Sequence, residues 1–109
     1  MVSMIDIENL AQRIVREFDP DKIILFGSYA HGTAGPDSDV DLLIVLPHPG
    51  KNWRKAAEIR SRVRSGFPMD LMVRAPEELR WRLEAGDPFL REVTERGRLL
   101  HARDHMRVD

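Results

Sequence analysis

The sequence contains no cysteine among its 109 residues. Disulfide frameworks and thiolate metal sites are therefore excluded, and any bound metal must be held by oxygen or by imidazole. Carboxylate ligands would favour magnesium or manganese over softer metals.

Long apolar runs are also missing. No stretch approaches the roughly 18 consecutive apolar residues of a membrane-spanning helix, and the N-terminus does not have the basic-then-apolar layout of a secretory signal. We therefore expect a cytoplasmic protein without membrane contact. With 42% hydrophobic and 32% charged residues, the length fits one compact domain over residues 1–109 and has no room for a second.

The net charge is small, at −1, but the two halves of the chain differ. Residues 1–50 carry three Lys or Arg against eight Asp or Glu, whereas residues 51–109 carry fourteen against ten. The basic second half can attract a nucleotide, an acidic partner or nucleic acid. Because the whole is far from the strongly basic balance of a dedicated nucleic-acid binder, we do not expect direct nucleic-acid binding.

Helical and strand-like patterns alternate along the chain. Helices are expected over residues 4–18 and 28–31, from about 53 to 65, and from Pro76 and Pro88 onward; strands are expected over residues 22–26, 40–46, 69–73 and 98–101. The segment 40–46 is apolar on both faces except at its aspartates, which predicts a central strand covered on both sides. The pattern predicts a small α/β domain with three or four strands, whose order the sequence leaves open.

The most informative motif combines a Gly-Ser turn with two aspartates. Asp39 and Asp41 stand one residue apart at the start of the apolar segment, so their side chains face one side of a strand, about 7 Å apart at the backbone. Their oxygens can converge on a pair of divalent cations. Gly27 and Ser28 leave the preceding strand in a turn whose N–H groups can bind phosphate. Together these residues predict a nucleoside triphosphate held by metal.

A third carboxylate is needed to complete such a site, and Asp70 is the only acidic residue in the strand expected over residues 69–73. Burying Asp70 there without a partner would cost several kcal/mol, which makes a cation a reasonable partner. Nucleotidyl transfer depends on positioning and on neutralising charge. We therefore predict Asp39 and Asp41 as shared metal ligands and Asp70 as a third ligand that also activates the attacking hydroxyl.

The segment 23–46, with its Gly27-Ser28 and Asp39-Val40-Asp41 motifs, resembles the MNT-type minimal nucleotidyltransferases of the DNA polymerase beta superfamily. The resemblance implies a nucleotidyltransferase fold: an α/β (α+β) arrangement with a small mixed β-sheet of three to four strands and helices packed against it.

The same resemblance implies roles for individual residues. Asp39, Asp41 and Asp70 match the catalytic, metal-binding aspartates, which hold two Mg²⁺ ions with Mn²⁺ as an alternative, and Gly27 and Ser28 hold the triphosphate of ATP. Two departures stand out. His31 occupies a position where relatives usually have arginine, which predicts weaker nucleotide binding or activity, and His101 stands where relatives often have tyrosine.

Members of this family transfer a nucleoside monophosphate, commonly AMP from ATP, to a hydroxyl acceptor. The smallest members are often encoded beside a helical HEPN protein, an RNase toxin on which the MNT antitoxin adenylylates a tyrosine. The resemblance therefore implies a Mg-dependent adenylyltransferase, the antitoxin of a toxin-antitoxin system, in a hetero-oligomer with a HEPN-type partner. Two alternatives stay open: a non-catalytic antitoxin that neutralises its partner by binding, and a nucleotidyltransferase acting on a small molecule or an RNA end.

Other conspicuous residues have simpler interpretations. The four histidines do not have metal-ligand spacing and are interpreted as structural or solvated: His31, His48, His101 and His105. Trp53 and Trp81 are interpreted as core or interface anchors rather than as base-stacking platforms. The basic stretch over residues 51–64 is either a solvated helix face or a surface for a partner or nucleotide.

Overall fold

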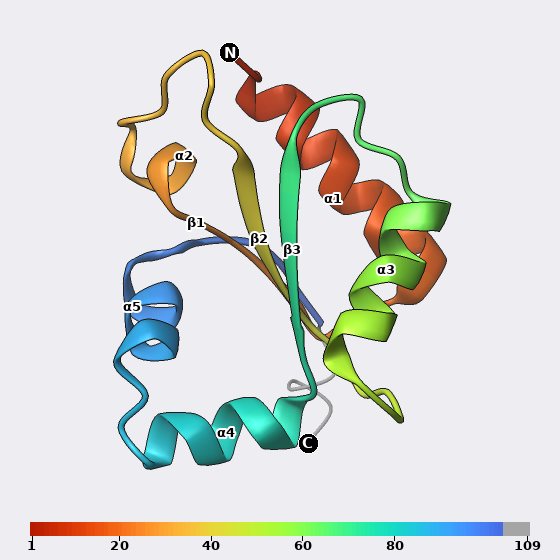
Figure 1. The fold of residues 1–109 in the computed structure, drawn as a ribbon, viewed down its shortest axis with the longest axis vertical. Helices are drawn as coiled ribbons and strands as arrows, with labels where there is room; N and C mark the ends of the chain where they lie inside the picture. The colour runs from red at the N-terminus through yellow and green to blue at the C-terminus, as the bar shows by residue number, and fades with distance from the viewer. Residues whose placement is uncertain (104–109) are drawn as a thin grey trace.

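A computed structural model of the chain describes residues 1–103, in which five helices surround a four-stranded sheet (Figure 1). The elements in chain order are α1 (Met4–Phe18), β1 (Lys22–Phe26), α2 (Ser28–His31), β2 (Val40–Val45), α3 (Asn52–Arg62), β3 (Met69–Arg74), α4 (Pro76–Glu84), α5 (Pro88–Arg96) and β4 (Arg98–Ala102). The predicted α/β (α+β) class with a small mixed sheet is confirmed. His105 lies outside the described residues.

The sheet has the strand order β3-β2-β1-β4. β1 is antiparallel to β2 and to β4, whereas β2 and β3 run parallel. β2 is therefore an inner strand, and its residues are buried except for the half-buried Asp41, which confirms the prediction of a central strand covered on both sides.

The helices form a layer on each face of the sheet, α1 and α3 on one side and α4 and α5 on the other (Figure 1). Alternation along β2 separates the two cores, since successive side chains of a strand point to opposite faces. Leu42 and Ile44 pack with α1 and α3, and Leu43 and Val45 pack with α4 and α5. Asp41, two residues before Leu43, belongs to the α4 and α5 face.

The first helix follows the predicted bounds. Its buried stripe has the spacing expected of an amphipathic helix and comprises Ile7, Leu10, Ala11 and Ile14. The Ser3 hydroxyl accepts a hydrogen bond from the Asp6 N–H at 3.1 Å, which caps the first turn.

Other boundaries differ slightly from the sequence-based expectation. α3 ends at Arg62 rather than near residue 65, because Val63 turns into an extended conformation. β2 ends one residue earlier than expected, and β3 and β4 end one residue later. Within residues 1–103, no helix combines the length and apolar composition needed to cross a membrane.

The interpretation of the tryptophans as core residues is wrong. Trp53 is 66% exposed and Trp81 is 55% exposed. The buried contacts of α3 begin only at Ala56, one turn after Trp53, so the indole remains at the surface. An interface role for these side chains stays a prediction.

Candidate functional site

Strand pairing brings two of the predicted aspartates side by side. Asp41 of β2 and Asp70 of β3 are register partners in the parallel ladder, so their side chains project on the same face of the sheet. Asp39 precedes β2 by one residue. Burial raises the pKa of Asp41, and the negative charges of Asp70 and Asp39 raise the pKa further. All three carboxylates therefore lie within electrostatic range of one another.

The prediction that Asp70 is buried is wrong. Asp70 is exposed, and among the three aspartates only Asp41 is half-buried. The reason is that β3 is an edge strand and Asp70 is its second residue. The case for a cation at Asp70 therefore rests on repulsion between neighbouring carboxylates, not on desolvation.

The ligand type suits a divalent cation such as Mg²⁺, since Asp39, Asp41 and Asp70 supply only oxygen ligands. As the side chains stand, no group of three or more His, Asp or Glu within residues 1–103 has the spacing to surround one ion. Asp39 and Asp70 are exposed, so both can change rotamer without breaking core packing. The residues are those that magnesium prefers, and the arrangement requires side-chain rotation before all three can share a cation.

The Gly27 turn packs directly against the Asp41 carboxylate. Gly27 has a φ of 73°, and a Cβ atom added there would lie 3.2 Å from Asp41 Cγ and would overlap Asp41 Oδ2. Only glycine combines this backbone conformation with so close an approach. The predicted phosphate-binding turn and the predicted metal-binding strand are therefore in contact.

The turn also presents free hydrogen-bond donors. The Gly27 carbonyl accepts hydrogen bonds from the N–H groups of Ala30 at 3.1 Å and His31 at 3.3 Å. In the described part of the chain, the Ser28 and Tyr29 N–H groups have no acceptor, because α2 begins at Ser28. Unpaired amides at a tight turn can bind an anionic oxygen.

Sequence reasoning missed the contribution of α5 to this region. A hollow of about 260 Å³ beside the turn is lined by Phe26, Gly27, His31, Phe89 and Glu92, among others. The Phe26 and Phe89 rings pack edge to face with centroids 5.7 Å apart, and Phe89 is 48% exposed. One feature of the sequence could have indicated this contribution: Phe89 is a large apolar residue in the first turn of α5, but it is not one of the helix's buried positions, Leu90 and Val93.

The histidines in the described residues do not gather around a common point. His48 hydrogen-bonds to the Pro49 carbonyl and to Asn52, and His101 lies 3.2 Å from the Pro20 carbonyl, which supports the interpretation of both as structural. His31 is exposed and lines the hollow beside Gly27.

Comparison with known proteins gives an independent result. The sequence matches the family described as "Nucleotidyltransferase domain" over residues 7–101. No curated protein matches this chain.

Several solved structures are similar to this fold. One is a toxin-antitoxin crystallised with AMP-PNP: the matched chain is 26% identical, the match covers 91% of this chain and 76% of that chain, and the TM-score is 0.59. A second is a putative nucleotidyltransferase from Sulfolobus solfataricus, 18% identical over 91% of this chain and 79% of that chain, with a TM-score of 0.63. A third is the toxin-antitoxin MntA-HepT, 21% identical over 95% and 76% of the two chains, with a TM-score of 0.53.

Proposed function

Because this chain belongs to the nucleotidyltransferase domain family, we propose that it is a Mg-dependent adenylyltransferase that moves AMP from ATP to a hydroxyl of a separate protein. The observation that carries the proposal is that Asp41 of β2 lies against Gly27, in the turn after β1, and beside Asp70 of β3. We propose further that residues 1–109 act as one domain, in the cytoplasm where ATP and magnesium are available.

In the proposed site, each residue has a distinct task. Asp39 and Asp41 hold two Mg²⁺ ions, or Mn²⁺ in their place, and Asp70 completes the ligand set. The Ser28 N–H at the Gly27 turn binds the triphosphate. The hollow beside Phe26 and Phe89 has room for another part of the nucleotide.

Bound magnesium would neutralise the triphosphate and lower the pKa of the attacking hydroxyl. The chain's own residues orient the reactants, and Asp70 accepts the proton of the acceptor hydroxyl. The acceptor oxygen then forms a bond to the α-phosphorus while the bond from that phosphorus to pyrophosphate breaks. In this single displacement Asp70 receives the proton, the acceptor oxygen receives the AMP group and pyrophosphate leaves.

The proposed partner is a HEPN-type toxin, with a tyrosine hydroxyl as the acceptor and a hetero-oligomer as the working assembly. Support comes from the similar chain of a toxin-antitoxin crystallised with AMP-PNP. AMP-PNP is an analogue of ATP, so that structure supports both a toxin partner and an adenine nucleotide for the proposed reaction.

The test is transfer of label from α-phosphate-labelled ATP, with magnesium, to the product of the neighbouring gene, which we expect to be a HEPN-type protein. Asp39→Asn and Asp70→Asn should each lower the rate at least about 100-fold, since metal ligation contributes several kcal/mol to such transfer. Asp37→Asn is the matched control, because Asp37 is an exposed carboxylate in the same loop. Equal labelling by wild type and by Asp39→Asn would contradict the proposal.

A second candidate, an antitoxin that neutralises its partner by binding alone, is favoured by His31 in place of the family's arginine. Inhibition of the partner that persists without ATP in the Asp39→Asn variant would support it. A small-molecule or RNA-end acceptor would instead appear as label on that acceptor and none on the partner.

A further inference from the structure

The strand that carries Asp70 has a free edge. Within residues 1–103, β3 pairs only with β2 and ends the sheet. The carbonyls of Pro68 and Arg74 accept hydrogen bonds from β2 and its extension, so the alternate peptide groups of Leu71 and Val73 face away from the sheet. The Val73 carbonyl accepts a hydrogen bond from Arg74 Nη1 at 2.7 Å. The remaining outward groups are available to an added strand.

A groove of about 440 Å³ runs beside this edge, between β3 and the first turns of α3. We call it the β3 groove; its lining includes Lys51, Asn52, Trp53, Ala56 and residues 71–74. Trp53, at 66% exposure, forms an apolar wall. An exposed tryptophan at the rim of a groove is typical of a binding anchor.

The rim of the β3 groove is positively charged. Neither Lys51 nor Arg54 forms an ion pair within residues 1–103, and both are exposed. The Arg54 guanidinium lies 5.3 Å from the Trp53 ring centroid, which holds one cation beside the apolar wall. The groove therefore favours an occupant that is acidic and carries an apolar or aromatic side chain.

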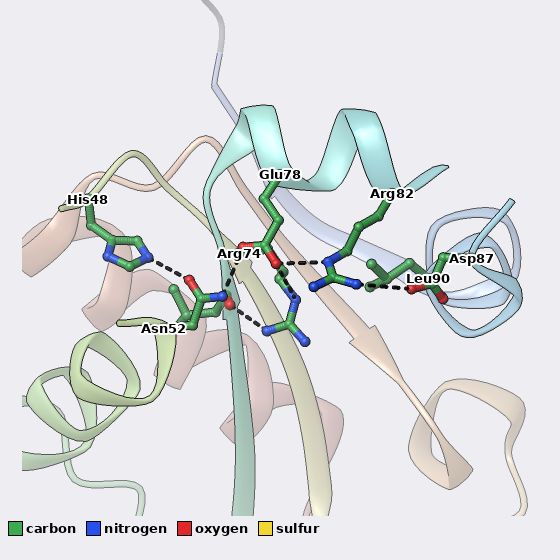
Figure 2. A network of polar contacts seen from close by, with 8 residues as sticks. His48, Asn52, Arg74, Glu78, Arg82, Asp87 and Leu90 are labelled. Carbon is green, nitrogen blue, oxygen red and sulfur yellow. Dashed lines mark hydrogen bonds and ion pairs between the residues drawn. The ribbon is translucent and has the colours of Figure 1, made fainter. Parts of the chain in front are cut away.

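A polar network fixes one end of the groove (Figure 2). Asn52 Nδ2 donates to Glu78 Oε1 at 2.9 Å, and Arg82 Nε donates to Glu78 Oε2 at 2.8 Å. Arg74 Nε lies 3.8 Å from Glu78 Oε2. The hydrogen bond from Asn52, then that from Arg82, holds the pKa of Glu78 below its usual value. α3 and α4 are thereby tied together across the end of β3, and the charge of Arg74 is already paired.

We propose that the β3 groove binds an extended acidic segment of a partner protein, which adds to β3 as a further strand and brings its acceptor hydroxyl to Asp70. The last part rests on the proposed adenylyl transfer; the docking part does not. A residue that pairs with Asp70 from the outer side projects on the same face as Asp70 and Asp41. Strand addition therefore aligns an acceptor side chain with the carboxylates without a separate acceptor domain.

Basic residues beside an aromatic ring also suit single-stranded nucleic acid. The outward N–H and carbonyl of Leu71 and the outward N–H of Val73 favour a peptide instead, because only another backbone can satisfy a strand edge in register.

The first experiment measures binding without ATP. The probe is a fluorescein-labelled peptide, Glu-Glu-Val-Tyr-Val-Glu-Glu, compared with the same core flanked by lysines, with a version N-methylated at alternate peptide groups, and with oligouridylate. We expect the acidic peptide to bind roughly tenfold or more tightly than the other probes, and its binding to slow hydrogen exchange at the Leu71 and Val73 amides. No binding, or tighter binding of the lysine peptide, the methylated peptide or oligouridylate, would overturn the proposal.

Variants of the groove provide the matched comparison. Trp53→Ala should weaken acidic-peptide binding by roughly tenfold, within the range of interface hot spots, and Lys51→Glu with Arg54→Glu should abolish the preference for acidic flanks. Trp81→Ala is the control, because Trp81 is also exposed and lies under an arginine, with Arg82 at 4.9 Å, but on α4. Equal effects of Trp53→Ala and Trp81→Ala would contradict the assignment.

The two proposals fail in different ways. Asp39→Asn should leave peptide binding intact while abolishing label transfer from ATP. Peptide binding without any transfer to the peptide or to the partner would refute adenylyl transfer and keep the docking surface. Transfer to the partner that is indifferent to Trp53→Ala and to the charge reversal would refute the docking surface and keep the enzyme.

Discussion

Gly27, in the turn after β1, is in contact with Asp41 of β2, so a single added carbon at position 27 would displace a proposed metal ligand. The sequence indicated both residues by their types and their motif. It did not indicate the contact, because Cα-to-carboxylate packing depends on the register of β1 against β2, in which Phe26 pairs with Asp41. For Asp70 the sequence-based prediction of burial was wrong, because the sequence did not reveal that β3 is the edge strand.

Gly27→Ala should reduce ATP and Mg²⁺ binding together and lower the free energy of unfolding by about 1–3 kcal/mol, from the overlap with Asp41 and the left-handed backbone. Gly32→Ala is the matched control, because Gly32 has nearly the same φ of 74° but open space at its Cβ position. Urea denaturation and calorimetric titration measure the two effects. Equal behaviour of the two variants would show that the contact has no functional weight.

The raised pKa of Asp41 makes stability depend on pH. The folded state binds the Asp41 proton more tightly than the unfolded chain, so the resulting stability is present at acidic pH and is lost as the pH rises through the raised pKa. In metal-free buffer, Asp41→Asn should therefore increase the free energy of unfolding at neutral pH by up to about 1 kcal/mol, with the gain vanishing in acid. Urea titrations from acidic to neutral pH measure this difference. A gain of the same size at acidic and at neutral pH would contradict the assigned cause.

At the element scale, all nine helices and strands of residues 1–103 were predicted with the correct type, because their apolar periods, capping residues and prolines agree locally. The packing of these helices and strands against one another was harder to predict from the sequence. Helix α5 contacts β1 through Gly97, where an added Cβ would overlap the Val93 and Leu25 carbonyls and the Ile24 side chain. This close approach brings Phe89 beside Phe26, and no local pattern in the sequence encodes it.

Gly97→Ala should force α5 away from β1 and lower the free energy of unfolding by about 1–3 kcal/mol. The hollow beside Gly27 should change shape, so ATP affinity should fall as well. Gly35→Ala is the control, since its Cβ position is open. Chemical denaturation with nucleotide titration tests both effects, and an unchanged Gly97→Ala protein would contradict the packing described for α5.

At the scale of the whole molecule, the acidic half of the chain supplies Asp39 and Asp41, and the basic half supplies Asp70 and the rim of the β3 groove. The parallel pairing of β2 with β3 joins the two halves at the carboxylates. A ligand that binds there should stabilise the entire fold, because it contacts residues from both halves.

ATP and Mg²⁺ added together should raise the melting temperature more than the two separate effects combined. The reason is that Mg²⁺ neutralises the repulsion between the triphosphate and the carboxylates of Asp39, Asp41 and Asp70. At 100 times the dissociation constant, the expected stabilisation is about 2.7 kcal/mol. Scanning calorimetry with and without a chelator measures it. Asp37→Asn should retain the effect and Asp39→Asn should lose it; retention by both would contradict the metal assignment.

The helices and strands, the inner position of β2 and the residue types of the site could be predicted from the sequence, because these follow from local periodicity and from the chemistry of carboxylates and a Gly-Ser turn. Long-range packing was needed to establish that β3 is the edge strand and that Asp70 is exposed beside Asp41. The same is true of the position of α5 beside the turn and of Trp53 at the rim of the β3 groove. Strand order and helix docking arise from contacts between residues far apart in the chain, and a local pattern carries no information about which distant partner it will meet.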